Sequence, residues 1–337
     1  MDSLHYVRRF SKTSEIFIYE YVNGLENESC NVEVLTHYRE NKKRDPLIKY
    51  MLLTPPVAGI PAGCGIGFEI EDEREPPELP FGRRRGNALR RLFEVWNRKK
   101  TAYQHASEQD QLHVVCPSEW MADEARASTL LADVPVSVIP YGLDTNRFFP
   151  CDAEGVPPAF GIPDDHRIVL FVASDTRARK GFDLLDNALS ALGAEKTTLL
   201  SVGGDEPELE SDLPHVHAGY VESDLLLSVL YSLADVFVIP SRQDNLPNTV
   251  LESMACGTPV IGFEVGGIPD MVRPGETGWL AEPEDVRSLR EAIEASLSDD
   301  AVRRQRGERA RAVVEKEYTL EVQARGYKDV YQRLLRE

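Results

Sequence analysis

The stretch that decides the fold is residues 235–263, which read DVFVIPSRQDNLPNTVLESMACGTPVIGF. Residues 235–241 predict a strand, because residues 236–240 are apolar, as is typical of a strand covered on both faces. A helix signal follows, with Pro247 suited to the first helical position and Gly257 to the residue after the end. Residues 259–263 are apolar again and predict a second strand. A strand, a short helix and a strand in this order predict a parallel βαβ unit with a right-handed crossover.

The same alternation extends through the second half of the chain. Apolar runs predict strands at 167–174 and 197–204, and helical spacing predicts helices at 182–192, 222–234 and 283–297. Ser223 is the expected N-cap of the helix at 222–234. The first half is less regular, with predicted strands at 3–10, 30–38, 112–118 and 134–142 and a predicted helix at 14–25. An antiparallel sandwich would have closely spaced strands without helical intervals, so the pattern favours an α/β fold with parallel sheets.

The length of 337 residues predicts two domains. The regular pattern breaks at CDAEGVPP, residues 151–158, which indicates a boundary there. We therefore expect an N-terminal domain at 1–150 and a C-terminal domain at 151–318, with a final helix at 319–337 that packs back toward the first domain. Residues 50–85 are rich in Pro, Gly and charge and predict a long loop.

Composition excludes several classes of protein. No apolar run reaches the roughly 18 residues of a membrane span, and the N-terminus lacks the apolar core of a signal peptide. The net charge is −18, and residues 151–337 carry 34 Asp and Glu against 19 Lys and Arg, which argues against nucleic-acid binding. The cysteines form no Cys-x-x-Cys pair, which favours a reducing cytoplasm over a disulfide framework or a zinc site: Cys30, Cys64, Cys116, Cys151 and Cys256.

Two carboxylates in the opening stretch, Asp244 and Glu252, stand eight positions apart. Ligands of open parallel sheets bind beyond the carboxyl ends of the strands, and Asp244 lies in the loop at such an end. The N–H groups at the start of the following helix favour anions, and Glu252 lies about a turn and a half along that helix. A phosphorylated sugar would use all three features. The alternative is an ordinary helix cap followed by a solvent-facing Glu.

A second cluster follows the predicted strand at 167–174. Arg177, Arg179 and Lys180 precede Gly181 and a helix, within an acidic domain. Arginine forks and a lysine ammonium group are suited to a diphosphate, although a solubilising surface loop has the same composition. Gly266 and Gly267, after another strand, would allow close approach of the backbone to a ligand, but such a pair is a weak signal.

Together these segments resemble the retaining glycosyltransferases of family 4, which have the GT-B fold. The resemblance runs, with gaps, from about residue 139 to the end, in RKGFDLL (179–185), VIPYGLDTNRFFP (138–150) and the long stretch from HAGYVES to GETGWL (217–280). Asp244 and Glu252 are similar to the E-x7-E motif of that family, with Asp at the first position. FSKTSEIFIYEYVNGL (10–25) and HVVCPSEWMADEARAS (113–128) are similar to first-domain segments of members that build bacterial surface polysaccharides.

The resemblance implies a fold and a set of site residues. The fold would be α/β, with two Rossmann-like parallel-sheet domains facing a cleft and a shortened first domain. Catalytic roles would fall to Asp244, which would contact the transferred sugar, and to Lys180 and Arg179, which would bind the diphosphate. The implied donor-binding residues are Arg177, the backbone of Asn245 and Leu246, Thr249, and Glu252 on the ribose; the implied acceptor-side residues are Ser14 and Glu15.

The implied activity is retaining transfer of a hexose from a UDP- or GDP-sugar to a saccharide or lipid-linked saccharide in surface polysaccharide synthesis. The nucleotide-sugar is a co-substrate and no further cofactor is implied. The chain contains no Asp-x-Asp, so metal-independent transfer is expected. The sequence also departs from the family: Ser174 and Asp175 occupy the usual region of the phosphate-binding Arg, and His37, His105 and His113 lack the context of the first-domain His.

Those departures keep two alternatives open: a sugar-nucleotide-binding protein with a reduced first domain, and a sugar-nucleotide epimerase of the same fold. A phosphorylase, which also shares this architecture, would need a lysine-bound pyridoxal site, for which no pattern stands out.

Residues 83–100, RRRGNALRRLFEVWNRKK, hold eight cations and one acid. Their apolar residues follow helical spacing: Leu89, Leu92, Phe93 and Trp96. A basic amphipathic helix can lie on anionic lipid, which predicts peripheral contact with the inner face of a membrane. The alternative is that the apolar stripe packs on the protein core.

Overall fold

The structure is a computed structural model that describes residues 3–7, 32–36, 101 and 112–335, apart from 129, 154, 174–177, 193–195 and 205. The chain divides into two compact units, one formed by residues 1–52 with 140–337 and the other by residues 53–139. The finer division predicted above, at 150 and 318, stays a prediction. None of the helices in the described ranges is long and apolar enough to cross a membrane.

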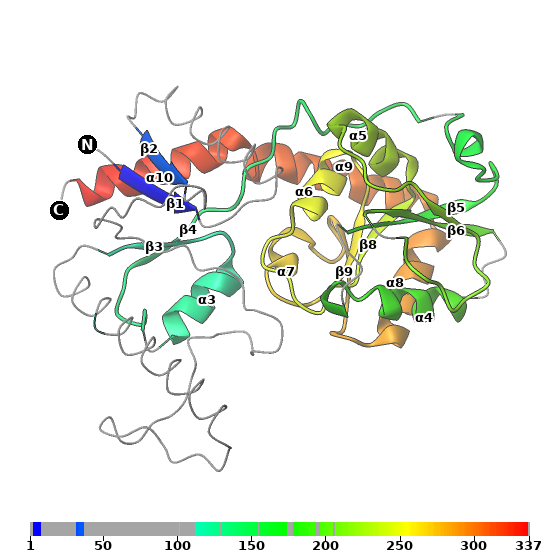
Figure 1. The fold of residues 1–337 in the computed structure, drawn as a ribbon, viewed down its shortest axis with the longest axis horizontal. Coiled ribbons are helices and arrows are strands. Elements are labelled where there is room, and N and C mark those ends of the chain that lie inside the picture. The colour runs from blue at the N-terminus through cyan, green and yellow to red at the C-terminus, as the bar shows by residue number, and fades with distance from the viewer. Residues whose placement is uncertain are drawn as a thin grey trace, which may run out of the picture. The chain divides into compact units, whose positions relative to one another are not determined.

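A six-stranded sheet with all strands parallel forms the core of the first unit (Figure 1). Its strands lie in the order β10-β9-β8-β5-β6-β7. Their bounds are Arg167–Val172 (β5), Thr197–Val202 (β6), His215–His217 (β7), Val236–Ile239 (β8), Val260–Phe263 (β9) and Gly278–Ala281 (β10). The parallel α/β architecture predicted from the sequence is confirmed.

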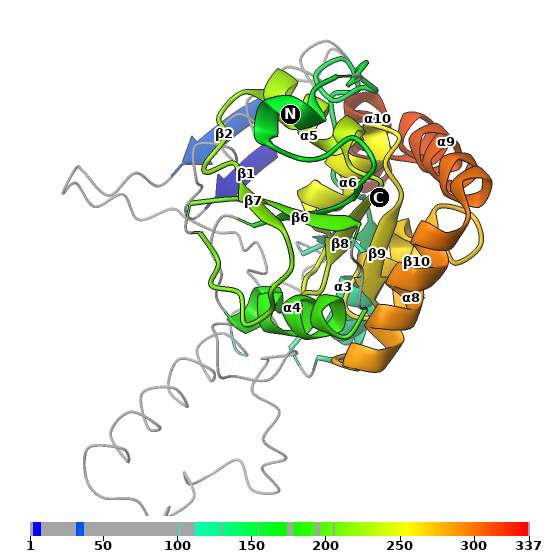
Figure 2. The same cartoon turned by 90° about the vertical axis from the view of Figure 1, so that its right-hand side faces the viewer.

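Helices cover both faces of this sheet, as Figure 2 shows. Helices α4 (Phe182–Ser190) and α8 (Val286–Ser298) pack on one face. The other face is covered by α5 (Asp224–Leu233), α6 (Asn248–Ala255), α7 (Ile268–Met271) and α9 (Asp300–Glu317). Alternate residues of a strand point to opposite faces, so Val169 and Phe171 of β5 join the α4 core while Ile168 and Leu170 join the other. This explains why β5 is apolar without interruption.

The strand order places a topological switch point between β5 and β8. From β5 the chain adds β6 and β7 on one side, and then returns to add β8, β9 and β10 on the other. In open α/β sheets, ligands bind at the carboxyl edge beside such a switch point, which is where the loops that follow β5 and β8 lie. These are the loops that carry the predicted cations and Asp244.

The helix boundaries follow the sequence signals closely. Ser223 caps α5 and accepts a hydrogen bond from the Leu226 backbone N–H, as predicted. Pro247 is the N-cap of α6 rather than its first residue, because its ψ of 123° is extended and the helix begins at Asn248. A shift of one residue is the usual uncertainty of a helix end.

The remaining described elements are smaller. Strands β1 (Ser3–Val7) and β2 (Val32–Thr36) pair in parallel, within two of the predicted strand regions. In the second unit, β3 (Val114–Cys116) pairs in parallel with β4 (Val136–Val138), and α3 (Glu119–Ala127) packs on them. The final helix α10 (Leu320–Leu334) was predicted, and Thr319 caps it.

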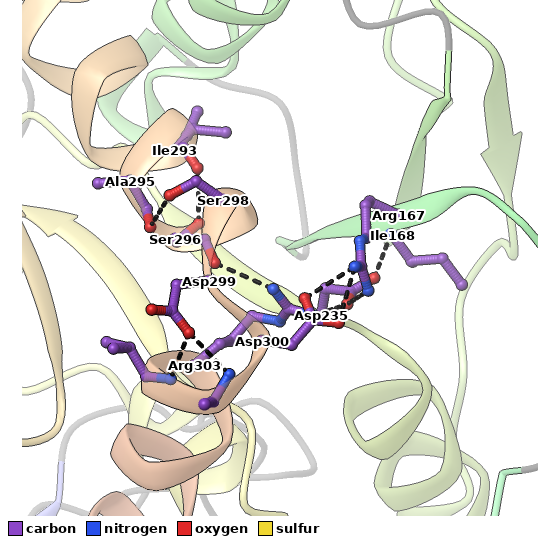
Figure 3. Close-up of polar contacts among 12 residues, drawn as sticks. Arg167, Ile168, Asp235, Ile293, Ala295, Ser296, Ser298, Asp299, Asp300 and Arg303 are labelled. Atoms are coloured by element: carbon purple, nitrogen blue, oxygen red, sulfur yellow. Dashed lines mark hydrogen bonds and ion pairs between the residues drawn. The ribbon is translucent and has the colours of Figure 1, made fainter.

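A cluster of charged residues joins β5, β8 and α9 at the amino edge of the sheet, opposite the edge that carries the loops after β5 and β8 (Figure 3). Arg303 has a side chain only 7% exposed, and it contacts Asp235 at 2.7 Å and Asp300 at 2.9 Å. Asp235 also accepts a 2.8 Å hydrogen bond from the Ile168 N–H, and Arg167 contacts both carboxylates. The cluster fastens the start of α9 to the start of β5, which is a structural role.

Replacing Arg303 with Ala is therefore expected to lower the free energy of unfolding by about 2 kcal/mol, because Asp235 and Asp300 each lose a well-shielded partner. Arg167 still pairs with both carboxylates, which limits the loss. Denaturant unfolding measures the change. Arg287→Ala is the matched control, since the Arg287 side chain is 74% exposed and its 3.9 Å ion pair is worth less than about 1 kcal/mol. Equal stability losses in the two variants would contradict the assignment.

Candidate functional site

The carboxyl edge of the sheet brings Lys180 and Asp244 together. Lys180 closes a 3₁₀ turn, Ala178–Lys180, in the loop after β5, and Asp244 lies in the loop after β8. The Lys180 Nζ lies 2.8 Å from Asp244 Oδ2, and both side chains are about one-sixth exposed. Arg179, which is half exposed, reaches the same carboxylate oxygen at 3.4 Å and donates to the Gln243 carbonyl at 3.0 Å. Residues 64 positions apart thus form one charged group.

Close backbone contact holds these two loops together. Gly181, with φ +67°, packs directly on the Pro240 carbonyl, where a side chain would not fit. The Arg242 N–H donates to the Arg179 carbonyl at 2.9 Å. The Arg242 guanidinium also contacts Asp183 in the first turn of α4 at 2.6 Å and Glu284 at 2.9 Å. The position of the cation turn relative to Asp244 is therefore fixed by the backbone as well as by the ion pair.

A third loop, after β9, closes on Asp244 from the other side. Gly266 has φ +55°, and its Cα faces the Asp244 carbonyl so closely that an added Cβ would lie 1.7 Å from the oxygen. The Gly267 N–H donates to the same carbonyl at 3.2 Å, and Gly267 is also the N-cap of α7. The predicted close approach of this glycine pair to a ligand stays a prediction, and the structure shows a close approach to the backbone of Asp244.

Helix α6 begins beside this loop and carries the remaining predicted donor residues. No side chain caps its N-terminus, so the N–H groups of its first residues are not used by a capping side chain. Thr249 is partly buried in its first turn. Leu246 is buried, with its side chain in the core, which leaves its backbone for the predicted contact. The helix dipole places a partial positive charge near Asp244, Lys180 and Arg179.

Glu252 lies on α6, where the buried residue Tyr231 of α5 donates a 2.9 Å hydrogen bond to its Oε2. Burial raises the pKa of Glu252 from 4.5 to about 7, against the opposing effect of the Tyr231 hydrogen bond. A carboxyl group with such a pKa changes its charge near neutral pH, and its hydroxyl-accepting form predominates above that value.

The raised pKa predicts a pH dependence of stability. Below pH 4.5 Glu252 is protonated in both states, and above pH 7 it is ionised in both, so the folded protein loses stability as pH rises between these values. The free energy of unfolding of the wild type, minus that of Glu252→Gln, should fall with a slope of up to about 1.4 kcal/mol per pH unit. Denaturant unfolding between pH 5.5 and 8 measures it. Burial lowers the pKa of His215, which makes the free energy of unfolding rise with pH. Because His215 is present in both proteins, this contribution cancels when the variant is subtracted from the wild type. A difference independent of pH would contradict the raised pKa.

The structure thus describes seven of the predicted donor-side and catalytic residues: Lys180, Arg179, Asp244, Asn245, Leu246, Thr249 and Glu252. Lys180, Arg179 and Asp244 are in contact, and the other four lie on the loop and helix that continue from Asp244. The roles of all of them stay predictions. Arg177, Ser14, Glu15, His37, His105, the loop 50–85 and the helix 83–100 lie outside the described residues.

Two residues of this region were not predicted. Arg242 stands two positions before Asp244, but its partners come from elements 42 and 59 residues away. Tyr231 lies 21 positions before Glu252, and no motif spacing links them. Among the residues that the structure describes, no group of three or more His, Cys, Asp or Glu is arranged to hold a metal ion.

Comparison with known proteins agrees with this architecture. Residues 166–299, which span β5 to the end of α8, match the model of the family described as "Glycosyl transferases group 1". The chain is 27% identical over 202 residues to an N-acetyl-alpha-D-glucosaminyl L-malate synthase of Bacillus anthracis, covering 58% of the chain and 53% of that protein. It is 29% identical over 232 residues to the lipopolysaccharide core biosynthesis mannosyltransferase LpcC of Rhizobium leguminosarum bv. viciae, covering 64% of each.

Among solved structures, Anabaena HepE in complex with UDP and glucose is similar over 98% of both chains, with a TM-score of 0.64 and 14% sequence identity. At this identity the likeness shows the fold, which is of the GT-B type. The aligned part of this chain spans about half the length of the Bacillus anthracis synthase. Residues 166–299, which hold the six-stranded parallel sheet, are thus similar to the group 1 glycosyl transferase family.

Proposed function

We propose that this protein is a retaining glycosyltransferase that moves a hexose from a UDP- or GDP-sugar to a saccharide or lipid-linked saccharide acceptor. The observation that carries the proposal is the contact between Lys180 and Asp244 at the switch point, 2.8 Å apart, beside the uncapped start of α6. Such a group offers cations to a diphosphate and a carboxylate to sugar hydroxyls within one small region.

The leaving diphosphate gains negative charge as the glycosidic bond breaks. The Lys180 ammonium group has three donors and uses one on Asp244, which leaves two for phosphate oxygens. Arg179 uses its Nη1 on Gln243 and Asp244, so its remaining N–H groups are available to the same ligand. Donors fixed in advance stabilise developing charge more than they stabilise the bound substrate, which lowers the barrier.

Asp244 is proposed to contact the transferred sugar near the reacting carbon, and the backbone of Asn245 and Leu246 to hold its hydroxyls. Glu252 is proposed to accept hydrogen bonds from the ribose, with Thr249 beside the phosphates. The bound UDP and glucose of the similar HepE structure support this class of donor. The names of the relatives, which include a lipopolysaccharide mannosyltransferase, support an acceptor in surface polysaccharide synthesis.

The acceptor side rests on Ser14, Glu15 and the helix at 83–100, which lie outside the described residues. Peripheral contact with the inner face of a membrane and metal-independent transfer are part of the same proposal. Both are open to direct assay, by vesicle sedimentation and by activity in the presence of EDTA.

The test is to incubate the protein with UDP-glucose, UDP-N-acetylglucosamine, UDP-galactose and GDP-mannose, and to measure release of UDP or GDP with and without saccharide acceptors. The expected result is release from one donor that increases with an acceptor, and a product whose anomeric proton coupling matches that of the donor. A thermal shift should accompany it, since a ligand at 100 times its dissociation constant adds about 2.7 kcal/mol of stability. Inversion of the anomeric centre would overturn the retaining assignment.

A sugar-nucleotide-binding protein without transfer is the second candidate, favoured by the short first domain expected from the sequence. It predicts the same thermal shift with no acceptor-dependent release. The two assays together therefore separate the candidates, and the absence of both signals would overturn both.

A further inference from the structure

Tyr231 and Glu252 form a buried link between α5 and α6. The Tyr231 side chain is wholly buried, and its hydroxyl donates to Glu252 Oε2 at 2.9 Å. Tyrosine is more often only partly buried, and a buried hydroxyl requires a polar partner. Here that partner is a carboxylate on α6, the helix that begins four residues after Asp244. The bond is charge-assisted when Glu252 is ionised, which makes it stronger than a neutral hydrogen bond.

The position of the hydroxyl is fixed by its surroundings. The Tyr231 ring packs edge-to-face on Phe237 of β8, with centroids 5.7 Å apart. Its carbonyl accepts hydrogen bonds from the Thr258 Oγ1 at 2.6 Å and from the Ala234 N–H at 3.1 Å. Ring and backbone are therefore both held, so the hydroxyl is presented to Glu252 from a fixed point.

We propose that Tyr231 is a positioning residue, whose hydroxyl holds Oε2 of Glu252 so that Oε1 is presented to the ribose hydroxyls of the donor nucleotide. The proposal rests on the proposed function, because it takes Glu252 to be the ribose ligand. A Glu carboxylate rotates broadly about its last torsion, and a single hydrogen bond to one oxygen removes most of that freedom. A bidentate contact with two ribose hydroxyls needs such a fixed orientation.

The charges around Glu252 give the hydroxyl a second effect. Asp224 and Tyr231 face it from α5, Cys256 lies one turn further at the C-cap of α6, and α9 brings Arg311 to the Ala255 carbonyl at 2.6 Å. Burial and Asp224 raise the pKa of Glu252, whereas the Tyr231 hydrogen bond lowers it. Loss of the hydroxyl would therefore leave a carboxyl group that ionises at higher pH and accepts ribose hydrogen bonds less well at neutral pH.

Tyr231→Phe tests the proposal because it removes only the hydroxyl. Of UDP and GDP, the one that the wild type binds more tightly is compared with its 2′,3′-dideoxy form by calorimetry from pH 6 to 8.5. The wild type should prefer the ribonucleotide. In Tyr231→Phe, the ratio of the dissociation constants of the dideoxynucleotide and the ribonucleotide should fall about tenfold at pH 7, which is the expected effect of losing one hydrogen bond to a charged group. This ratio should rise again only at higher pH, where Glu252 ionises.

Tyr318→Phe is the matched control. Tyr318 is also buried, and its hydroxyl donates to the Asp270 carbonyl at 2.9 Å, away from Glu252. It should lose stability like Tyr231→Phe and keep the wild-type preference for ribose. An unchanged preference in Tyr231→Phe, with nucleotide binding intact in the wild type, would overturn the positioning role. No nucleotide binding by the wild type would instead overturn the proposed function.

Discussion

Lys180→Ala is expected to lower kcat/KM for sugar transfer by about two to three orders of magnitude. This is the usual loss when one fixed donor to a developing negative charge is removed. The effect should be large because Lys180 is mostly shielded, with a side chain 17% exposed, so its charge is weakly screened. Arg179 also contacts Asp244, but at 3.4 Å and half exposed, and it is a poorer substitute. Initial rates at varied donor concentration give the parameter.

Lys196→Ala is the control for this prediction. Lys196 lies just before β6, is 70% exposed and pairs with Asp165 at 2.7 Å. Lys196→Ala therefore removes one positive charge from the same unit, as Lys180→Ala does, but at the opposite edge of the sheet. Its kcat/KM should stay within about twofold of the wild type, since exposed pairs contribute little. A Lys180→Ala variant as active as Lys196→Ala would show that the contact with Asp244 serves the fold alone.

The location of Lys180 and Asp244 at the same edge of the sheet was predictable from the sequence, although the residues are 64 positions apart. Two buried parallel strands, each followed by a charged loop, bring those loops to one edge of the sheet whatever the details of packing. Strands β5, β8 and β9 were equally clear, because residues covered on both faces leave uninterrupted apolar runs. Topology and hydrophobicity were sufficient for these features.

Other features depend on packing that leaves no pattern in the sequence. Strand β7 is three residues, His215–His217, at the edge of the sheet, where half-buried polar residues are accepted. Helix α9 is so rich in charge that its buried residues, including Ala310 and Val314, are hard to see as a stripe. Tyr231 reaches Glu252 only because α5 and α6 pack with particular faces toward each other, and the sequence pattern does not predict which faces meet.

Gly266 combines a backbone requirement with a close contact, and the two can be separated by experiment. Its φ of +55° costs an alanine about 1 to 2 kcal/mol. A Cβ would also lie 1.7 Å from the Asp244 carbonyl oxygen, so the loop that carries Asp244 must move. Gly275 has φ +80°, but a Cβ there would meet nothing within 4 Å. Gly275→Ala therefore has the backbone strain of a positive φ without the steric clash.

We expect Gly266→Ala to lose about 3 to 4 kcal/mol of unfolding free energy, which is the backbone strain plus the cost of overpacking. Gly275→Ala should lose about 1 to 2 kcal/mol.

The two variants should also differ in donor binding. Displacement of Asp244 from the 2.8 Å contact with Lys180 should weaken nucleotide-sugar binding in Gly266→Ala at least tenfold, because misplacement by about 1 Å costs an active site that much or more. Gly275→Ala should bind normally. Denaturant unfolding and calorimetry at a temperature where both variants are folded make the comparison. Normal donor binding by a destabilised Gly266→Ala would mean that the loop after β8 tolerates displacement, and Asp244 would then not hold the sugar from the position seen in the structure.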